Sequence, residues 1–396
     1  MKAFGVLYLF EWKKILRQGL VPVSILLGAL LLLAANISPL LGTGYYYRYD
    51  AQRGTVDRTA MPYGEVEKLR RDSLRALSGQ VLDEALMDQL KENYWDSEVG
   101  TIQWNLNAYA PFLYLNTVED RSGASAEDFY RQQAEHFQKE SISAPLTDAE
   151  LAYWQEQAAG LGPMYLDYAG GWQAMVERCG LLCQAAVLLV TAALCRFCSE
   201  EHRARTDQLV LSSEKGKTTA FWARCAAGVS FAVGIAVVFS ALQMALCGML
   251  YGIDGVSVPL QLWVEGSFSA LPVTMGQFVL ILLVLLVLAC GMAAGFVMLL
   301  SELFGTAIPA LVVPFALSAA SILGLFVGNG RWMEQAASYL PFFRVSADTL
   351  QDYYLVTLGS LQLNSIQFSA VLYPLMAGLF GLLYRICHRR YQVTGR

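Results

Sequence analysis

Long apolar runs constrain this chain more than any other feature of its sequence. A helix that crosses a membrane needs about 20 predominantly apolar residues. Runs of this kind cover residues 20–42, 174–195, 221–250, 273–300, 306–328 and 367–386. Only 15% of the 396 residues are charged, whereas about a quarter are charged in a typical soluble domain. The sequence therefore predicts an all-α polytopic membrane protein with six transmembrane helices.

The first apolar run has one alternative interpretation, a cleaved signal peptide. The apolar core of a signal peptide is about 7–15 residues long, and this run is longer. We therefore expect residues 20–43 to form an uncleaved first span.

Basic side chains predict the orientation of the spans. They are concentrated in residues 1–19, in the loop 196–224 and in the tail after Tyr384. Lys and Arg close to span ends stay on the cytoplasmic side of a membrane. With six spans, these three segments fall on one side, so both termini and the loop are predicted to be cytoplasmic. Residues 44–172 and 329–366 are then extracellular.

The N-terminal segment 1–19 is predicted to be an amphipathic helix in the inner membrane interface. Its apolar residues recur at helical spacing, with basic residues opposite them. The apolar face holds Phe4, Leu7, Tyr8, Trp12, Ile15 and Leu16, and the basic face holds Lys2, Lys13 and Arg17. Glu11 falls on the apolar face, so we expect it to reach Lys14 or another segment. The alternative is a helical extension of the first span.

The segment 44–172 is predicted to be a large, mostly helical extracellular domain. It carries 11 basic and 21 acidic side chains and none of the eight cysteines. Capping-box spacing at Ser125/Asp128 and Thr147/Glu150 predicts the starts of two of its helices. Residues 173–396 hold the remaining spans and the outer segment 329–366, which is expected to form short interfacial helices or an ordinary loop.

Few polar side chains fall within the spans. Ionisable groups inside a membrane indicate function by default, so Glu177, Arg178, Gln184 and Gln277 are candidates for a translocation path. The alternative is that the charged pair marks the interface and the glutamines bond between helices.

Several kinds of active site are excluded. The chain has no G-x-x-x-x-G-K-[ST] nucleotide-binding loop, and its three histidines lie in different regions. This argues against a histidine-based metal centre and against a Ser-His-Asp hydrolase. Cys195-x-x-Cys198 lacks a second pair. No cofactor and no nucleic acid is therefore expected on this chain, which is not predicted to be an enzyme itself.

The polar loop 196–224 carries the most specific pattern. It resembles the first cytoplasmic loop of ABC-2 type transporter permeases, although the usual proline after the serines is absent. The residues that match are Phe197, Ser199, Glu200, Glu201, Arg205, Thr206, Asp207, Leu209, Leu211, Ser212, Ser213, Lys215, Lys217 and Arg224.

The resemblance implies the permease subunit of a bacterial cell-membrane exporter. Two permeases, identical or related, would pair, and each would dock on a separate ABC ATPase that holds ATP and Mg. The loop would be the coupling helix, with contacts from Glu200, Glu201, Arg205, Asp207, Leu209, Leu211, Ser213 and Lys217. The alternative is a membrane sensor or resistance module whose outer domain binds a peptide and signals to a cytoplasmic partner.

Overall fold

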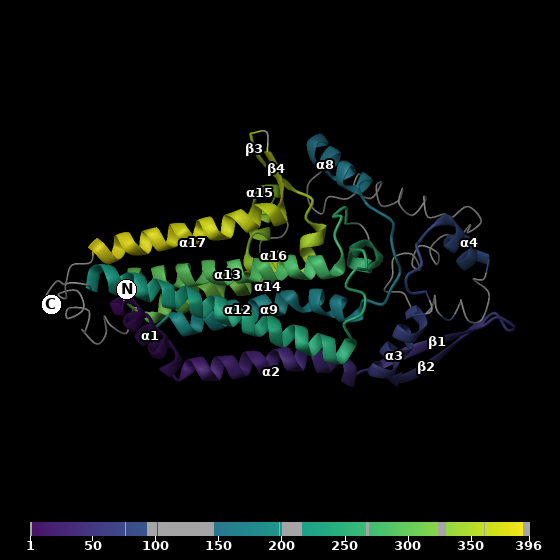
Figure 1. Cartoon of the computed structure of the whole chain (residues 1–396), viewed down its shortest axis with the longest axis horizontal. Helices are drawn as coiled ribbons and strands as arrows, with labels where there is room; N and C mark the ends of the chain where they lie inside the picture. Colours follow the sequence, from purple (N-terminus) through teal and green to yellow (C-terminus); the bar gives the residue numbers. More distant parts are fainter. Residues whose placement is uncertain are drawn as a thin grey trace.

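The computed structural model describes residues 2–75, 77–92, 101, 146–197, 199, 216–266, 269–323, 330–359 and 361–390. The molecule is long, with a helical bundle at one end and a smaller region at the other (Figure 1). The start of α1 and the end of α17 lie at the same end of the bundle, here called the termini end. The opposite end, from which the hairpin β1–β2 projects, is called the hairpin end.

Five helices of the described chain are long and apolar enough to cross a membrane. They are α2 (Leu20–Leu41), α9 (Gly170–Leu194), α12 (Phe221–Tyr251), α13 (Met275–Phe304) and α17 (Ser365–Arg390). Their length and composition fit a multi-pass helical membrane protein, as the apolar runs predict.

The predicted span 306–328 is only partly matched. Its described part is α14 (Ala307–Ile322), a helix of 16 residues with Pro314 inside it. At about 1.5 Å per residue this helix is roughly 24 Å long, short of the ~30 Å hydrocarbon core of a bilayer. Residues 324–329 lie outside the described part of the chain, so a sixth span stays a prediction.

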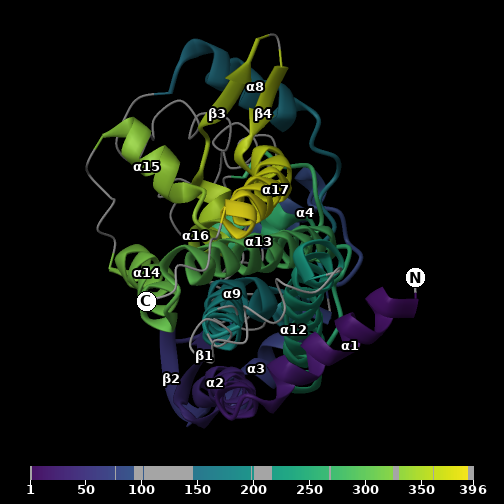
Figure 2. The ribbon, with the colours of Figure 1, turned by 90° about the vertical axis from the view of Figure 1, so that its left-hand side faces the viewer.

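The bundle is organised around α9. This helix packs against α2, α12 and α13, and α13 in turn packs along α17; Figure 2 shows α9 and α13 at the centre of the end view. Among the 18 most apolar consecutive residues of each helix, 78% are buried in α9, but only 17% in α2 and 11% in α17. The last two helices therefore present their apolar side chains outward.

The N-terminal helix α1 (Lys2–Arg17) packs against α12. The Tyr8 hydroxyl lies 2.8 Å from the Ser230 hydroxyl, and the Trp12 indole N–H donates to Ser230 at 2.9 Å. The Trp12 ring meets Phe231 edge-on, and Ile15 is fully buried. Part of the predicted apolar face thus covers α12, and α1 is a separate helix oblique to α2 (Figure 1).

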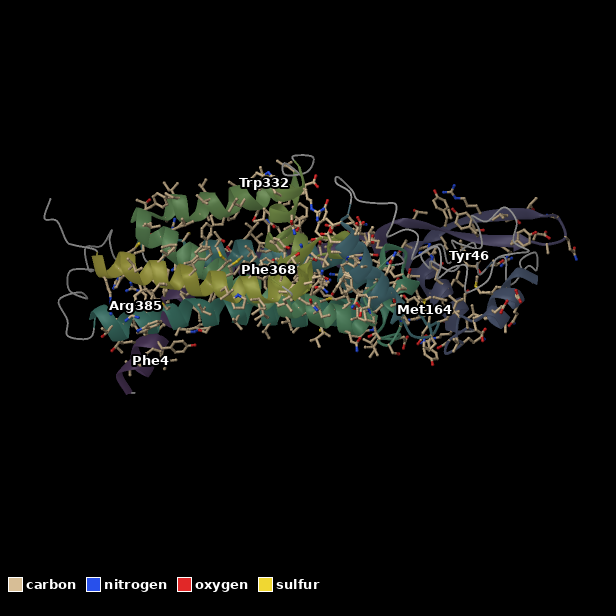
Figure 3. All side chains as sticks on the ribbon, turned by 90° about the horizontal axis from the view of Figure 1, so that it is seen from above. Phe4, Tyr46, Met164, Trp332, Phe368 and Arg385 are labelled. Atoms are coloured by element: carbon tan, nitrogen blue, oxygen red, sulfur yellow. The ribbon has the colours of Figure 1, made fainter. Side chains whose placement is uncertain are left out.

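The predicted all-α class needs correction, because the region after α2 begins with a β-hairpin. Strands β1 (Thr43–Asp50) and β2 (Thr55–Pro62) pair antiparallel along their whole length. Tyrosines and β-branched residues suit extended backbone, and Gly54 closes the turn with φ +63°. Figure 3 shows Tyr46 far from Phe4 and Arg385, toward the tip of the molecule.

The other long elements described in this region are helices. It comprises α3 (Tyr63–Arg75), α4 (Glu84–Glu92) and α8 (Asp148–Ala159). The Thr147 side chain accepts from the Glu150 N–H, and the Glu150 side chain accepts from the Thr147 N–H, which confirms the predicted capping box. The Ser125/Asp128 capping box lies outside the described residues.

A second hairpin lies in the segment before α17. After the short helices α15 (Arg331–Ser338) and α16 (Pro341–Arg344) and a 3-10 turn (Ala347–Gln351), strands β3 (Leu355–Leu358) and β4 (Leu361–Asn364) pair antiparallel. The predicted short helices are present, and the strands are a further departure from the all-α prediction. The loop between α12 and α13 holds two 3-10 turns, Leu260–Leu262 and Val264–Gly266.

The helix α8 is joined to this second hairpin. The Trp154 indole N–H donates to the Tyr353 carbonyl at 2.7 Å. Glu150 accepts hydrogen bonds from the Arg331 guanidinium and, at 3.0 Å, from the Leu355 N–H. The α8 and hairpin elements lie side by side in Figure 1. The segments that lead into α9 and into α17 are therefore tied together at the hairpin end.

Candidate functional site

Most of the predicted coupling residues lie outside the described part of the chain. They are Glu200, Glu201, Arg205, Asp207, Leu209, Leu211 and Ser213. Lys217 is described only by its backbone, in the π-helical turn Gly216–Ala220 that leads into α12. The structure therefore bears on the two flanks of the loop, both at the termini end.

The first flank, at the end of α9, is attached to α13 through one serine. The fully buried Ser301 hydroxyl donates to the Cys195 carbonyl at 3.0 Å and accepts from the Ser199 N–H at 3.2 Å. The Ser199 hydroxyl donates to the same Cys195 carbonyl at 3.4 Å. These bonds hold the backbone at the start of the loop against the end of α13.

The helix α1 reaches both flanks. The Lys14 ammonium donates to the Phe197 carbonyl at 3.3 Å and lies 5.2 Å from the centre of the Phe197 ring. Glu11 lies 3.8 Å from Lys14 and also 3.8 Å from Arg224 at the start of α12. Glu11 therefore contacts both Lys14 and another segment, the two alternatives expected from the sequence. Glu11 and Arg224 are buried, where an ion pair is screened less by salt than at the surface.

The end of α17 closes the other side of the second flank. The Phe221 ring centre lies 4.8 Å from that of Tyr384 and 5.3 Å from that of His388. The Nδ1 atom of His388 lies 2.9 Å from Oε1 of Glu302, at the end of α13. The sequence alone gives no partner for His388. The one signal for this pair is that Glu302 is acidic and that His388 belongs to the basic tail after Tyr384.

A polar pocket lies at the hairpin end, between α3 and the bundle. Its volume is about 200 Å³, and Glu177 and Arg178 both line it. Arg178 donates to the carbonyls of Ala35 and Ala174 at 3.2 and 2.9 Å and to the Tyr251 hydroxyl at 3.0 Å. These bonds join α2, α9 and α12, so Arg178 mainly positions helices.

The charged groups around this pocket balance, because Glu67 and Glu177 line it together with Arg70 and Arg178. Glu67 accepts from the Tyr168 hydroxyl at 2.6 Å and lies 3.6 Å from Arg70. Burial, followed by the charge of Glu67, raises the pKa of the nearby Tyr63 phenol. Tyr63 therefore stays a neutral donor at physiological pH.

The two candidate glutamines lie elsewhere. Gln184 lines a mainly apolar cavity of about 310 Å³ bounded by α9, α13, α14, α16 and α17. Gln277 caps α13, because its side chain accepts from the Thr274 N–H at 3.0 Å and its own N–H donates to the Thr274 hydroxyl at 3.3 Å. Of the four path candidates, the structure brings together only Glu177 and Arg178.

A buried polar pair joins α2 to α12, and only its Asn36 was not singled out from the sequence. Asn36 in α2 and Gln243 in α12 are both fully buried and exchange amide hydrogen bonds at 2.9 and 3.3 Å. Each provides the donor and acceptor that the other needs inside an apolar bundle. The described residues contain no cluster of three or more metal-binding side chains. The described cysteines are free thiols, and Cys198 lies outside this part of the chain.

Comparison with known proteins identifies no relative: no family model, no curated protein and no solved structure matches the chain. The resemblance of the loop 196–224 to ABC-2 permeases therefore stays a prediction from its residues.

Proposed function

We propose that the chain is the permease subunit of an ABC exporter and that the loop 196–224 receives the motion of a separate ATPase. The observation that supports this most strongly is the attachment of both loop flanks. Ser301 holds the first flank to α13, and Glu11 joins α1 to Arg224 in the second. A force applied to the loop would be passed to α1, α9, α12 and α13 together, as coupling requires.

Two other features fit this function. The apolar cavity between α9, α13 and α14 is space that helix movements could open or close. The outward-facing apolar surfaces of α2 and α17 are available to lipid or to a second permease, identical or related. ATP and Mg belong to the ATPase in this proposal, and both termini and the loop lie in the cytoplasm of a bacterial cell.

A photocrosslinking experiment tests the partner directly. A crosslinking amino acid at position 209 or 211 should capture an ABC ATPase in native membranes. The same amino acid at position 59, in the exposed strand β2, is the control and should not. Failure of both loop positions to capture an ATPase would contradict the proposal.

Charge reversal then tests coupling. The double variant Arg205→Asp, Asp207→Arg should keep assembly of the purified complex but reduce transport-linked ATP hydrolysis at least tenfold. The matched control is Asp50→Arg, Arg53→Asp, which reverses an ion pair of 3.6 Å in the outer hairpin. Unchanged hydrolysis and export in the loop variant would show that these side chains do not couple the subunits.

The sensor or resistance module is the second candidate, and one observation favours it. The contacts of Glu150 and Trp154 with the segment before α17 give the outer region a direct connection to a membrane helix. Capture of a cytoplasmic partner without ATPase activity at positions 209 and 211 would select this function over transport.

A further inference from the structure

A basic cavity lies in the elbow between α1 and α2, at the termini end of the bundle. Its volume is about 480 Å³. Lys13, Lys14 and Arg17 line it from α1, and Arg196 lines it from the end of α9. No acidic side chain is among its lining residues. Four cations from two separate parts of the chain therefore face one cavity.

Most of this charge is not neutralised within the described chain. Lys14 is partly balanced by Glu11 at 3.8 Å. The exposed Lys13, Arg17 and Arg196 form no ion pair with any described residue. Three cations that converge without a counter-charge among the described residues repel one another, so an anion in the cavity would relieve this repulsion.

A second observation concerns Gln18, which also lines the cavity. Its amide nitrogen and oxygen are both buried and have no hydrogen-bond partner in the described structure. A buried amide without partners costs about 1–3 kcal/mol, so this side chain is better satisfied with a ligand beside it. The start of α2 at Leu20 adds the partial positive charge of a helix N-terminus.

The surroundings of the cavity are apolar. Leu9, Phe10, Leu16 and Leu20 are all exposed large side chains on the same two helices. Phe10 and Leu20 line the cavity itself. A soluble anion gains nothing from such a rim, whereas a lipid places its acyl chains against the apolar side chains and its phosphate among the cations.

We propose that this cavity binds the phosphate headgroup of an anionic phospholipid. Arg17 and Arg196 supply guanidinium donors that match phosphate geometry, and Lys13 supplies a further charge. The bound headgroup would connect the α1–α2 elbow to Arg196, two residues after the end of α9. This proposal requires the chain to lie in a membrane but does not require that it transports anything.

Native mass spectrometry of the purified full chain in detergent tests the proposal. Added phosphatidylglycerol should bind as a defined one-to-one adduct, and phosphatidylcholine should bind at least tenfold more weakly. Arg17→Gln and Arg196→Gln should each weaken phosphatidylglycerol binding about fivefold, the effect of one Lys or Arg at an anionic surface. Arg196→Lys should retain most of the binding.

Arg389→Gln is the matched control, because Arg389 is an exposed arginine at the same end of the bundle but outside the cavity. It should bind lipid like the unchanged protein. Equal loss in Arg389→Gln and Arg196→Gln would show general charge attraction and overturn the site. Equal binding of phosphatidylcholine would also overturn it. Competition by millimolar inorganic phosphate as strong as by phosphatidylglycerol would assign the cavity to a soluble anion and refute the lipid.

Discussion

Removal of one hydroxyl should loosen the start of the loop 196–224. In the Ser301→Ala variant, the Ser199 N–H loses its acceptor and the Cys195 carbonyl loses one of its donors. The substitution removes a single oxygen from a fully buried position, so it leaves almost no cavity. Its effect should be confined to the contact between the end of α9 and the end of α13.

The free-energy cost of Ser301→Ala follows from the polar groups that lose a hydrogen-bond partner. One ordinary hydrogen bond contributes about 1 kcal/mol, and an unsatisfied buried donor costs about 1–3 kcal/mol. The Cys195 carbonyl keeps the Ser199 hydroxyl as a donor at 3.4 Å, which limits the loss. The expected cost is therefore about 2–3 kcal/mol, which raises the local opening constant roughly 30- to 140-fold.

Hydrogen exchange measured by mass spectrometry is the direct assay. Peptides that cover residues 195–199 should exchange about two orders of magnitude faster in Ser301→Ala, as expected from the free-energy cost. The control is Ser369→Ala, because Ser369 is also fully buried but donates only to Ser365 within its own helix. Its exchange at residues 195–199 should be unchanged.

If the 195–199 peptides exchange equally fast in Ser301→Ala and in the unchanged protein, the serine does not fix the loop flank. The proposed route from the loop to α13 would then lose its main contact.

Three further predictions concern other parts of the molecule. Gly171→Ala should lower the free energy of unfolding by about 1–3 kcal/mol, because a Cβ at this position would lie 1.8 Å from the Gly252 carbonyl oxygen. A melting temperature equal to that of the unchanged protein would contradict this. Asn36→Ala should cost about 1 kcal/mol in unfolding measurements, and much less in a Gln243→Leu background, so additive effects would argue against the amide pair. Burial raises the pKa of Glu150, but the hydrogen bonds that this carboxylate accepts outweigh burial and lower the pKa overall. The contact should therefore be fully stable above pH ~4.3, the ordinary pKa of Glu, and should weaken progressively as pH falls below that value. Calorimetry should find Glu150→Gln about 2 kcal/mol less stable than the unchanged protein at pH 7, and this difference should shrink as the pH falls; a difference that does not change with pH would contradict the prediction.

The spans could be predicted because each is encoded by its own residues. Length and hydropathy suffice to predict a membrane helix, and five of the six runs correspond to suitable helices. The run 306–328 is the exception, because its helix α14 already ends at Ile322, before the apolar run does. The capping box at Thr147 was predictable for the same reason, since its partners are three residues apart.

The hairpin β1–β2 was missed although its signal is local. Tyrosines at 45–47 and β-branched residues at 55, 56 and 59 stand on either side of a turn that contains Gly54. This pattern favours a hairpin, but the segment that follows it is rich in helix-forming residues and favours a helical region instead.

The contacts around the loop flanks could not be predicted from local patterns. Glu11 and Arg224 are more than two hundred positions apart, and Glu302 and His388 belong to different helices. Only the packing of α1 on α12 and of α13 on α17 brings these groups together. A pattern in one segment predicts that a polar residue needs a partner, but it does not identify that partner.

The two helices that carry the chain out of the bundle and back into it are neighbours. The segment between them leaves at Leu41 of α2 and returns at Gly170 of α9, and Arg178 bonds the end of one helix to the other. The region between them is therefore an insertion whose ends meet, as in domains that tolerate exchange. Evolution could enlarge or replace much of this region without altering the spacing of α2 and α9, so homologous bundles with very different insertions at this point are expected.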